Sequence, residues 1–407
     1  MESIVTQQIN KIRDIEQKKA LNSWAKQGFV GSVIAGTGFG KSRVGVLAVE
    51  YTLKQCLKAR PNRYRKKHSY SGKALILVPT VQLQEQFKEE FYKWGLEGCL
   101  DNVEVFCYQS AYKLKGEHYS IVICDEVHLG LSVEYRKFFK YNSYDSLLCM
   151  TATLPEEFEY KELLEKIAPT AYKITLDQCV KLGIVSPYKI SCVPVTLTVD
   201  EQSEYKKINN KFVYWKYKLG QFDAFDTAKT IMSDKNATPA DKQAAAQFYR
   251  CIRIRKSIVD FAENKITKFQ SIFKDNTDKR ILVFSGANDF TDRLCDSIAP
   301  NAMSYHSKKT KKQKKLALDS FKDGSINVLC STKALNQGFD VPNANMGIMC
   351  GITSKSLSMI QRVGRLVRFQ EGKVGEIIIL YVKDSQEEKW LKSAVKNLSN
   401  IVWKNNI

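Results

Sequence analysis

Short apolar runs with the composition of buried strands recur along the chain, and most are separated by segments with the period of a helix. They are VGSVIAG, KALILVP, NVEVFCY, YSIVICDE, SLLCMTAT, ISCVPVTL, RILVFSG, INVLCST, NMGIMCG and GEIIILYV. A strand that is apolar along its whole length is buried on both faces, as happens when helices cover both sides of a parallel sheet. The pattern therefore predicts an α/β fold with parallel sheets.

The alternation stops at about 200 and resumes after 278, and between these points the apolar residues take helical spacing. Single cores stop growing at roughly 250 to 300 residues, and this chain has 407. We therefore expect two lobes, residues 1–185 and 186–407, with the boundary near Gly183 to Pro187 and a helical insertion at about 200–278 in the second lobe.

Aromatic and basic residues alternate inside this insertion, for example in EYKKINNKFVYWKYKL. Such a pattern suits stacking on bases and contact with phosphates. Aromatic residues at helical spacing are more often core residues, however, so a packing role is the favoured interpretation.

The charge is unusual, because 63 Lys and Arg stand against 43 Asp and Glu, for a formal net charge of +20. A surface of this sign favours a polyanion such as nucleic acid over the alternative that the lysines only confer solubility. Two local runs, at 58–73 and 307–315, are either phosphate contacts or solvated surface.

Eleven cysteines are present, with no Cys-x-x-Cys pair, so the sequence indicates no zinc or iron–sulfur site. Several end apolar runs, which suits reduced thiols in a reducing compartment. The first residues lack the apolar core of a signal peptide, and no apolar run approaches the roughly 20 residues of a membrane span. We expect a cytoplasmic protein without membrane contact, a setting that also fits a phage or viral protein in its host.

The segment VGSVIAGTGFGKSRVGVLAVE reads as a strand, a glycine-rich loop and a helix. In such a loop the backbone N–H groups turn inward around phosphates, and the helix N-terminus adds partial positive charge. Lys41 would reach the β- and γ-phosphates, and the Ser42 hydroxyl would ligate Mg²⁺. Ala35 replaces the usual first glycine. The loop residues predicted to bind the nucleotide are Gly36, Thr37, Gly38, Phe39, Gly40, Lys41 and Ser42.

Some 80 residues further on, YSIVICDEVH places two adjacent carboxylates after an apolar strand. Ligands bind at the carboxyl ends of strands in parallel sheets. Asp125 would hold the Mg²⁺, and Glu126 would position and deprotonate the attacking water. His128 lies close enough in sequence to sense the γ-phosphate. The alternative is an acidic turn after a core strand.

Four motifs, AGTGFGKS, DEVH, MTATLP and QRVGRLVR, together resemble the motor of superfamily 2 helicases, and the resemblance covers most of the chain. LDQCVKLGIVSPYKISCVPVTLTVDEQSEY and STKALNQGFDVP are similar to the branch with phage branch-migration and xeroderma pigmentosum B-type helicases. His128 and Thr151 differ from the DEAD-box pattern.

The resemblance implies two RecA-like lobes with ATP and Mg²⁺ between them. It implies an ATP-dependent DNA helicase or translocase that moves along, unwinds or remodels DNA, including branched DNA. An RNA helicase and a motor subunit of a larger assembly are the alternatives. The sequence indicates no separate recognition domain. We therefore expect a protein partner to direct the enzyme to its nucleic acid.

In QRVGRLVR, a helix would align Gln361, Arg365 and Arg368 along one stripe, whereas Arg362 would point about 100° away. The matching arginines of the family act as fingers that reach the γ-phosphate from the second lobe. The alternative is an exposed basic helix.

The resemblance also implies contacts along the nucleic-acid backbone, at Pro79, Thr80, Gln109, Ser110, Ser285, Ser307, Thr332 and Lys333. Backbone contacts carry no sequence information, so binding should be largely independent of sequence. Gly338 and Asp340 would approach the nucleotide, although Gly338 also suits a tight turn. Gln17 resembles the glutamine that reads adenine, with Arg13 one residue away from the usual spacing.

Overall fold

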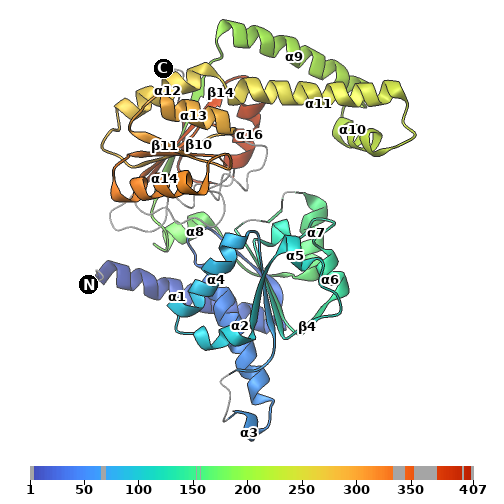
Figure 1. The fold of residues 1–407 in the computed structure, drawn as a ribbon, viewed down its shortest axis with the longest axis vertical. Coiled ribbons are helices and arrows are strands. Elements are labelled where there is room, and N and C mark those ends of the chain that lie inside the picture. Colours follow the sequence, from blue (N-terminus) through green and yellow to red (C-terminus); the bar gives the residue numbers. More distant parts are fainter. Residues whose placement is uncertain are drawn as a thin grey trace.

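A computed structural model describes residues 4–65, 70–152, 154–155, 157–332, 344–352, 374–396 and 398–404. Figure 1 shows two bodies of sheet and helix, one below the other, with a pair of long helices projecting from the upper body. Six predicted site residues lie outside the described residues: Lys333, Gly338, Asp340, Gln361, Arg365 and Arg368.

The first sheet has the strand order β3-β2-β5-β7-β1-β8, and every neighbouring pair is parallel. Its strands are β1 (Val30–Ala35), β2 (Ala74–Val78), β3 (Val103–Cys107), β5 (Ile121–Asp125), β7 (Leu147–Thr151) and β8 (Thr170–Ile174). A separate short ladder pairs β4 (His118–Tyr119) with β6 (Ser143–Tyr144).

Helices cover both faces of this sheet because alternate side chains of each apolar strand point to opposite sides. In β5, Ile121 and Ile123 pack with one set of helices, and Val122 and Cys124 with the other. The first set is α1 (Ile4–Lys26), α2 (Lys41–Lys58) and α4 (Val81–Lys93), and the second is α5 (Tyr108–Ala111), α6 (Lys137–Tyr141) and α7 (Phe158–Ile167). Shorter elements are α3 (Asn62–Arg65), η1 (Glu97–Asn102) and η2 (Val127–Leu129).

The second sheet has the order β11-β12-β10-β13-β14-β9-β15, again with parallel pairs throughout. Its strands are β9 (Tyr188–Val195), β10 (Ile281–Phe284), β11 (Ala302–Tyr305), β12 (Val328–Ser331), β13 (Met346–Met349), β14 (Gly375–Val382) and β15 (Ile401–Trp403). One face carries α12 (Glu263–Lys274) and α13 (Asn288–Asp296), and the other carries α14 (Lys311–Asp323) and α16 (Gln386–Val395). The predicted class, α/β with two parallel sheets, is confirmed.

The predicted helical insertion is also present in the second half of the chain. α9 (Val199–Lys218) lies against α11 (Pro239–Asp260), and α10 (Ala224–Ser233) caps their far end (Figure 1). Thr198 caps α9 with a reciprocal capping box that includes Glu201, and this box fixes where the helix begins. α12 then returns the chain to the second sheet.

The aromatic residues of the insertion divide between two environments. Phe212 and Trp215 pack with Phe248 in a small core between the helices, as the favoured interpretation predicted. Tyr214 and Tyr217 instead face solvent. The same helix therefore builds a core with one face and exposes tyrosines on another.

A fully buried ion pair joins two helices of the second lobe. The Lys265 ammonium lies 2.8 Å from Oε1 of Glu387, and neither side chain is more than 1% exposed. Lys265 also donates to the Cys350 carbonyl at 2.9 Å. Glu387 accepts the backbone N–H groups of Val382 at 2.8 Å and Ile352 at 3.2 Å. The pair thus provides hydrogen-bond partners for backbone groups next to the ends of β13 and β14.

Between the two sheets, α8 (Leu176–Lys181) and residues 182–187 connect β8 to β9. Thr175 caps α8 with a second capping box, completed by Gln178. Within the described part of the chain, no helix combines the length and the apolar character that a membrane crossing requires.

Candidate nucleotide site and nucleic-acid interface

The glycine-rich loop lies between β1 and α2, at the carboxyl edge of the first sheet, as predicted. Gly38 and Gly40 have φ values of +90° and +88°, a region that residues with a Cβ rarely adopt. Space is also restricted there, since a Cβ on Gly38 would lie 2.4 Å from Cγ1 of Val185. These glycines let the backbone fold inward, which is the geometry of a phosphate cradle.

Lys41 is the first residue of α2, and its ammonium donates to the Ala35 carbonyl at 3.0 Å. It therefore bends back over the loop that it follows. Ser42 is the next residue of the same first turn, where the helix dipole favours anions. Phe39 is buried, so only its backbone can face a ligand.

Gln17 reaches the same loop from α1 and is only 1% exposed. Its amide nitrogen donates to the carbonyls of Phe39 at 2.7 Å and Gly40 at 3.2 Å. Its amide oxygen accepts from Arg43 at 2.7 Å. Both ends of the amide thus brace the loop, a role that the sequence did not indicate. Its proposed contact with adenine stays a prediction.

Arg43 completes that brace and was not predicted as a functional residue. Its guanidinium pairs with Asp14 at 2.6 Å and lies 4.0 Å from the ring centroid of Trp94. These partners are 29 and 51 residues away in sequence, so no local spacing could have shown them.

Asp125 ends β5 at the same edge of the sheet and is almost completely buried. Burial, and then the charge of Glu126, raise the pKa of Asp125 to about 7, and the nearby charge of Lys41 opposes that rise. The structure therefore brings Lys41 and Asp125 close enough to interact. A desolvated carboxylate next to a second carboxylate is a setting that a divalent cation would stabilise.

Glu126 has a left-handed backbone, with φ of +48°, which is uncommon for a residue with a side chain. The sequence predicted different tasks for the two carboxylates, and that assignment stays a prediction. Oε2 of Glu126 lies 3.5 Å from Nδ1 of His128, and the same nitrogen lies 3.2 Å from the Thr151 hydroxyl. His128 thus links the DEVH segment to the end of β7.

Tyr108 is a further residue that the motifs did not single out. Its buried hydroxyl donates to the backbone carbonyl of Asp125 at 2.8 Å. The ring packs closely, because a Cβ on Gly130 would approach it to 2.5 Å. Tyr108 therefore holds the backbone of the predicted magnesium ligand.

The first-lobe candidates for nucleic-acid contact follow the ends of β2 and β3. Gln109 and Ser110 are exposed on α5, whereas Pro79 is buried. Thr80 precedes α4, and its buried hydroxyl has no hydrogen-bond partner among the residues that the structure describes. Only Gln109 and Ser110 present their side chains openly.

The second-lobe candidates gather around one residue that the sequence did not suggest, Asn288. Its amide nitrogen donates to the Ser307 hydroxyl at 3.3 Å, and its amide oxygen accepts from Thr332 at 3.0 Å. Ser285 differs, because it is buried and its hydroxyl bonds with Thr291 at 2.5 Å and with the Ala287 carbonyl at 3.0 Å. Contact between Ser285 and a ligand would require these bonds to break.

Lysines 308 and 309, in the second basic run, are partly neutralised. Lys308 pairs with Asp289 at 2.7 Å, and Lys309 pairs with Asp292 at 3.0 Å. Ser304, His306 and Lys309 together hold the pKa of Asp292 down at about 2 despite its partial burial. The run nevertheless lies beside Ser307, just after β11.

Two known families match this chain, and together with the fold they define its class. The Helicase conserved C-terminal domain matches residues 264–370, and the Type III restriction enzyme, res subunit, matches residues 6–156. The chain belongs to the superfamily 2 helicases and is an ATP-hydrolysing, nucleic-acid-dependent enzyme.

Among curated relatives, the chain is 26% identical over 377 residues to the DNA 3'-5' translocase XPB2 of Sulfurisphaera tokodaii, covering 88% of this chain and 79% of that protein. It is 22% identical over 382 residues to the pre-mRNA-splicing ATP-dependent RNA helicase PRP28 of Saccharomyces cerevisiae, covering 89% and 57%.

Two solved structures show the same fold at low sequence identity. The Pyrococcus furiosus Hef helicase domain has a TM-score of 0.52 and 17% identity, with coverage of 91% of this chain and 96% of that one. S. cerevisiae Dbp5 bound to RNA and ADP BeF3 has a TM-score of 0.55 and 14% identity, with coverage of 96% and 88%.

Proposed function

We propose that this helicase is a DNA translocase that uses ATP to move along, unwind or remodel DNA, including branched DNA. The observation that carries the choice of DNA is the match to the DNA 3'-5' translocase XPB2, which spans 79% of that protein, whereas the match to the RNA helicase PRP28 spans 57%. The residues His128 and Thr151, which depart from the DEAD-box RNA helicase pattern, agree with this choice. Movement in the 3'-5' direction is the corresponding expectation.

In this proposal the lobes divide at 185/186, and the catalytic parts of the first lobe meet at its carboxyl edge. Lys41 leaves the Ala35 carbonyl to contact the β- and γ-phosphates, while the backbone N–H groups of the loop hold the other phosphate oxygens. Glu126 orients the attacking water and accepts its proton. The buried position of Asp125 keeps bulk water from competing for its carboxylate.

Ser42 and Asp125 are the residues that would hold Mg²⁺, and the desolvated Asp125 carboxylate beside the charge of Glu126 fits a divalent cation. When bound, Mg²⁺ neutralises charge on the β- and γ-phosphates. Arg365 and Arg368 are proposed to supply positive charge from the second lobe, as in the related helicases, and the neutral amide of Gln361 is proposed to face the same ligand. The eleven cysteines are all free thiols, which supports a reducing compartment such as the cytoplasm.

The test compares the stimulation of ATP hydrolysis by single-stranded DNA, duplex DNA, forked DNA and RNA of matched length and charge. We expect stimulation by DNA, with an affinity that falls steeply with salt because phosphates dominate the contact. Stimulation by RNA alone would overturn the choice of DNA. A targeting partner is expected to change which DNA is preferred, whereas ATP hydrolysis should still depend on DNA.

Two variants test the site itself. Lys41→Ala and Glu126→Gln should each abolish hydrolysis, but Glu126→Gln should still bind nucleotide, since the side chain that it changes acts on the water. Turnover at the wild-type rate in either variant would refute the assignment of these residues.

A further inference from the structure

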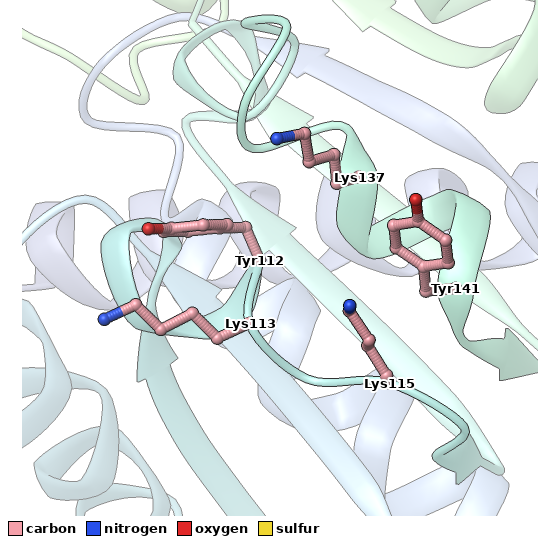
Figure 2. A pocket seen from close by; sticks show the side chains of 5 residues that line it. All are labelled: Tyr112, Lys113, Lys115, Lys137 and Tyr141. Carbon is pink, nitrogen blue, oxygen red and sulfur yellow. The ribbon is translucent and has the colours of Figure 1, made fainter.

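A pocket with a basic and aromatic lining lies on the first lobe, away from the glycine-rich loop. Its volume is about 320 Å³, and its lining residues are Tyr112, Lys113, Lys115, Lys137 and Tyr141. Figure 2 shows Lys137 and Tyr141 projecting from α6, opposite Tyr112, Lys113 and Lys115 from the segment that follows α5. We refer to these five residues as the tyrosine–lysine pocket. It includes none of the residues assigned above to nucleotide, magnesium or nucleic acid.

The charge of this pocket is positive and only partly compensated. Lys137 is paired with Glu134 at 2.8 Å. Lys113 and Lys115 are exposed, and neither has an acidic partner among the residues that the structure describes. No acidic residue contributes to the lining. A concave surface that is lined by several lysines and by no acidic residue attracts an anion.

The two tyrosines give the pocket apolar ring surfaces as well as charge. Tyr141 is 41% exposed. The Lys115 ammonium lies 5.2 Å from the Tyr141 ring centroid, and that of Lys113 lies 5.8 Å from the Tyr112 ring centroid. Aromatic faces interleaved with ammonium groups suit a ligand that carries both a flat base and a phosphate. A nucleotide unit of a nucleic-acid strand has this composition.

The position of the pocket connects it to the expected path of the nucleic acid. Tyr112 follows the exposed pair Gln109 and Ser110 by two residues, at the end of the same short helix. A strand in contact with Ser110 would therefore pass close to Tyr112, which lines the pocket. We propose that the tyrosine–lysine pocket binds a backbone phosphate and its neighbouring base on the nucleic acid that the motor engages. This inference rests on the proposed function.

A stack of tyrosine rings connects the pocket to the candidate catalytic carboxylates. The Tyr112 ring centroid lies 6.0 Å from that of Tyr135, which lies 6.2 Å from that of Tyr108 in a stacked arrangement. Tyr108 in turn donates its hydroxyl to the Asp125 carbonyl at 2.8 Å. A ligand in the pocket would therefore contact the tyrosine stack that supports the Asp125 backbone. Binding there should contribute to the stimulation of ATP hydrolysis by nucleic acid.

The test uses the full chain with the double variant Lys113→Glu/Lys115→Glu, and Lys26→Glu as control. Both sites are exposed, and Lys26 is the last residue of α1 and does not line the pocket. Binding of a fluorescent DNA oligonucleotide is measured across a salt series. We expect the double variant to bind on the order of tenfold more weakly at low salt, with a shallower salt dependence by about 0.7 to 0.9 per lost phosphate contact. The control should match the wild type.

Equal affinity and equal salt slope in the double variant and the control would overturn the inference, provided that the wild type binds and is stimulated by nucleic acid. A wild type that no nucleic acid stimulates would instead overturn the proposed function, and the inference with it. The unfolding midpoint of each variant confirms that the fold is retained.

A second measurement separates a strand from a free ligand and keeps the inference testable if the double variant misfolds. A DNA oligonucleotide with photoreactive thymidines is cross-linked to the wild-type chain, and the cross-linked peptides are identified by mass spectrometry. Cross-links to Tyr112 or Tyr141 support the inference. They should be lost in Tyr112→Ala and retained in Tyr112→Phe, which keeps the ring. Complete displacement of the cross-link by equimolar inorganic phosphate or AMP would show a site for free anions instead, and would overturn it.

Discussion

Replacement of Lys265 by methionine should destabilise the second lobe strongly and in a pH-dependent way. Methionine fills a similar volume but removes the ammonium group that faces Glu387 at 2.8 Å in a fully buried position. The carboxylate keeps its bonds to the backbone of Val382 and Ile352, but it loses its counter-charge. Removal of one partner from a buried ion pair costs about 3 to 5 kcal/mol, because the remaining charge has neither water nor a partner.

The pH dependence follows from the carboxyl group. Burial raises the pKa of Glu387 in the wild type, and the charge of Lys265 acts against that rise. Without Lys265 the pKa rises further, so the folded lobe binds a proton that the unfolded chain releases at about pH 4.3. Stability is therefore retained below that pH and is lost as the pH increases toward the folded pKa. We expect the cost of Lys265→Met to be larger at pH 8 than at pH 5.

The measurement is denaturant unfolding at both pH values, with amide hydrogen exchange at 377–382 to assign the transition to the second lobe. The double variant Lys265→Met/Glu387→Gln removes both charges and keeps an oxygen acceptor for the Val382 N–H. It should recover more than half of the lost stability and lose the pH dependence. A cost for Lys265→Met below about 1 kcal/mol, or one that is equal at pH 5 and pH 8, would refute this reasoning.

Further predictions concern the loop and the second-lobe interface. Gly38→Ala should weaken ATP binding roughly tenfold or more, since the added Cβ meets Val185 at 2.4 Å and the backbone is left-handed; unchanged affinity by titration calorimetry would contradict this. Gln17→Ala should weaken ATP and GTP binding alike, because the loop loses its brace, whereas a selective loss of ATP would indicate that Gln17 reads adenine. Asn288→Ala removes two hydrogen bonds of about 0.5 to 1.5 kcal/mol each. It should reduce nucleic-acid affinity several-fold and leave ATP binding intact, and equal loss of both would point to misfolding.

The strands in the interior of each large sheet could be predicted from the sequence. The runs around β5, β10 and β13 are continuously apolar because helices cover both of their faces, and each of them forms a strand. The two-residue strands β4 and β6 were missed, and in the two large sheets the missed strands β8, β11 and β15 are all at an edge. Their sequences, TAYKI, AMSY and IVW, are short or mixed in polarity because one side of an edge strand is not enclosed.

The candidate site was predictable only where chemistry dictates local spacing. A phosphate loop needs its glycines, lysine and serine within eight residues, so the sequence displays them together. Gln17, Tyr108 and Asn288 act through partners that are 22, 17 and 44 residues away, and only the fold brings them into contact. The same limit applies to Ser285, whose inward orientation depends on a hydroxyl six residues further along.

The contact between Gly38 and Val185 has a mechanical consequence. Val185 belongs to the short connector between the two sheets, and Arg13 holds the neighbouring Ile184 carbonyl at 2.9 Å. The glycine-rich loop thus lies directly against this connector, because Gly38 has no side chain to separate them. We therefore expect a loop that reshapes around phosphates to push on this connector, so that nucleotide binding and a change in the angle between the two lobes would be coupled.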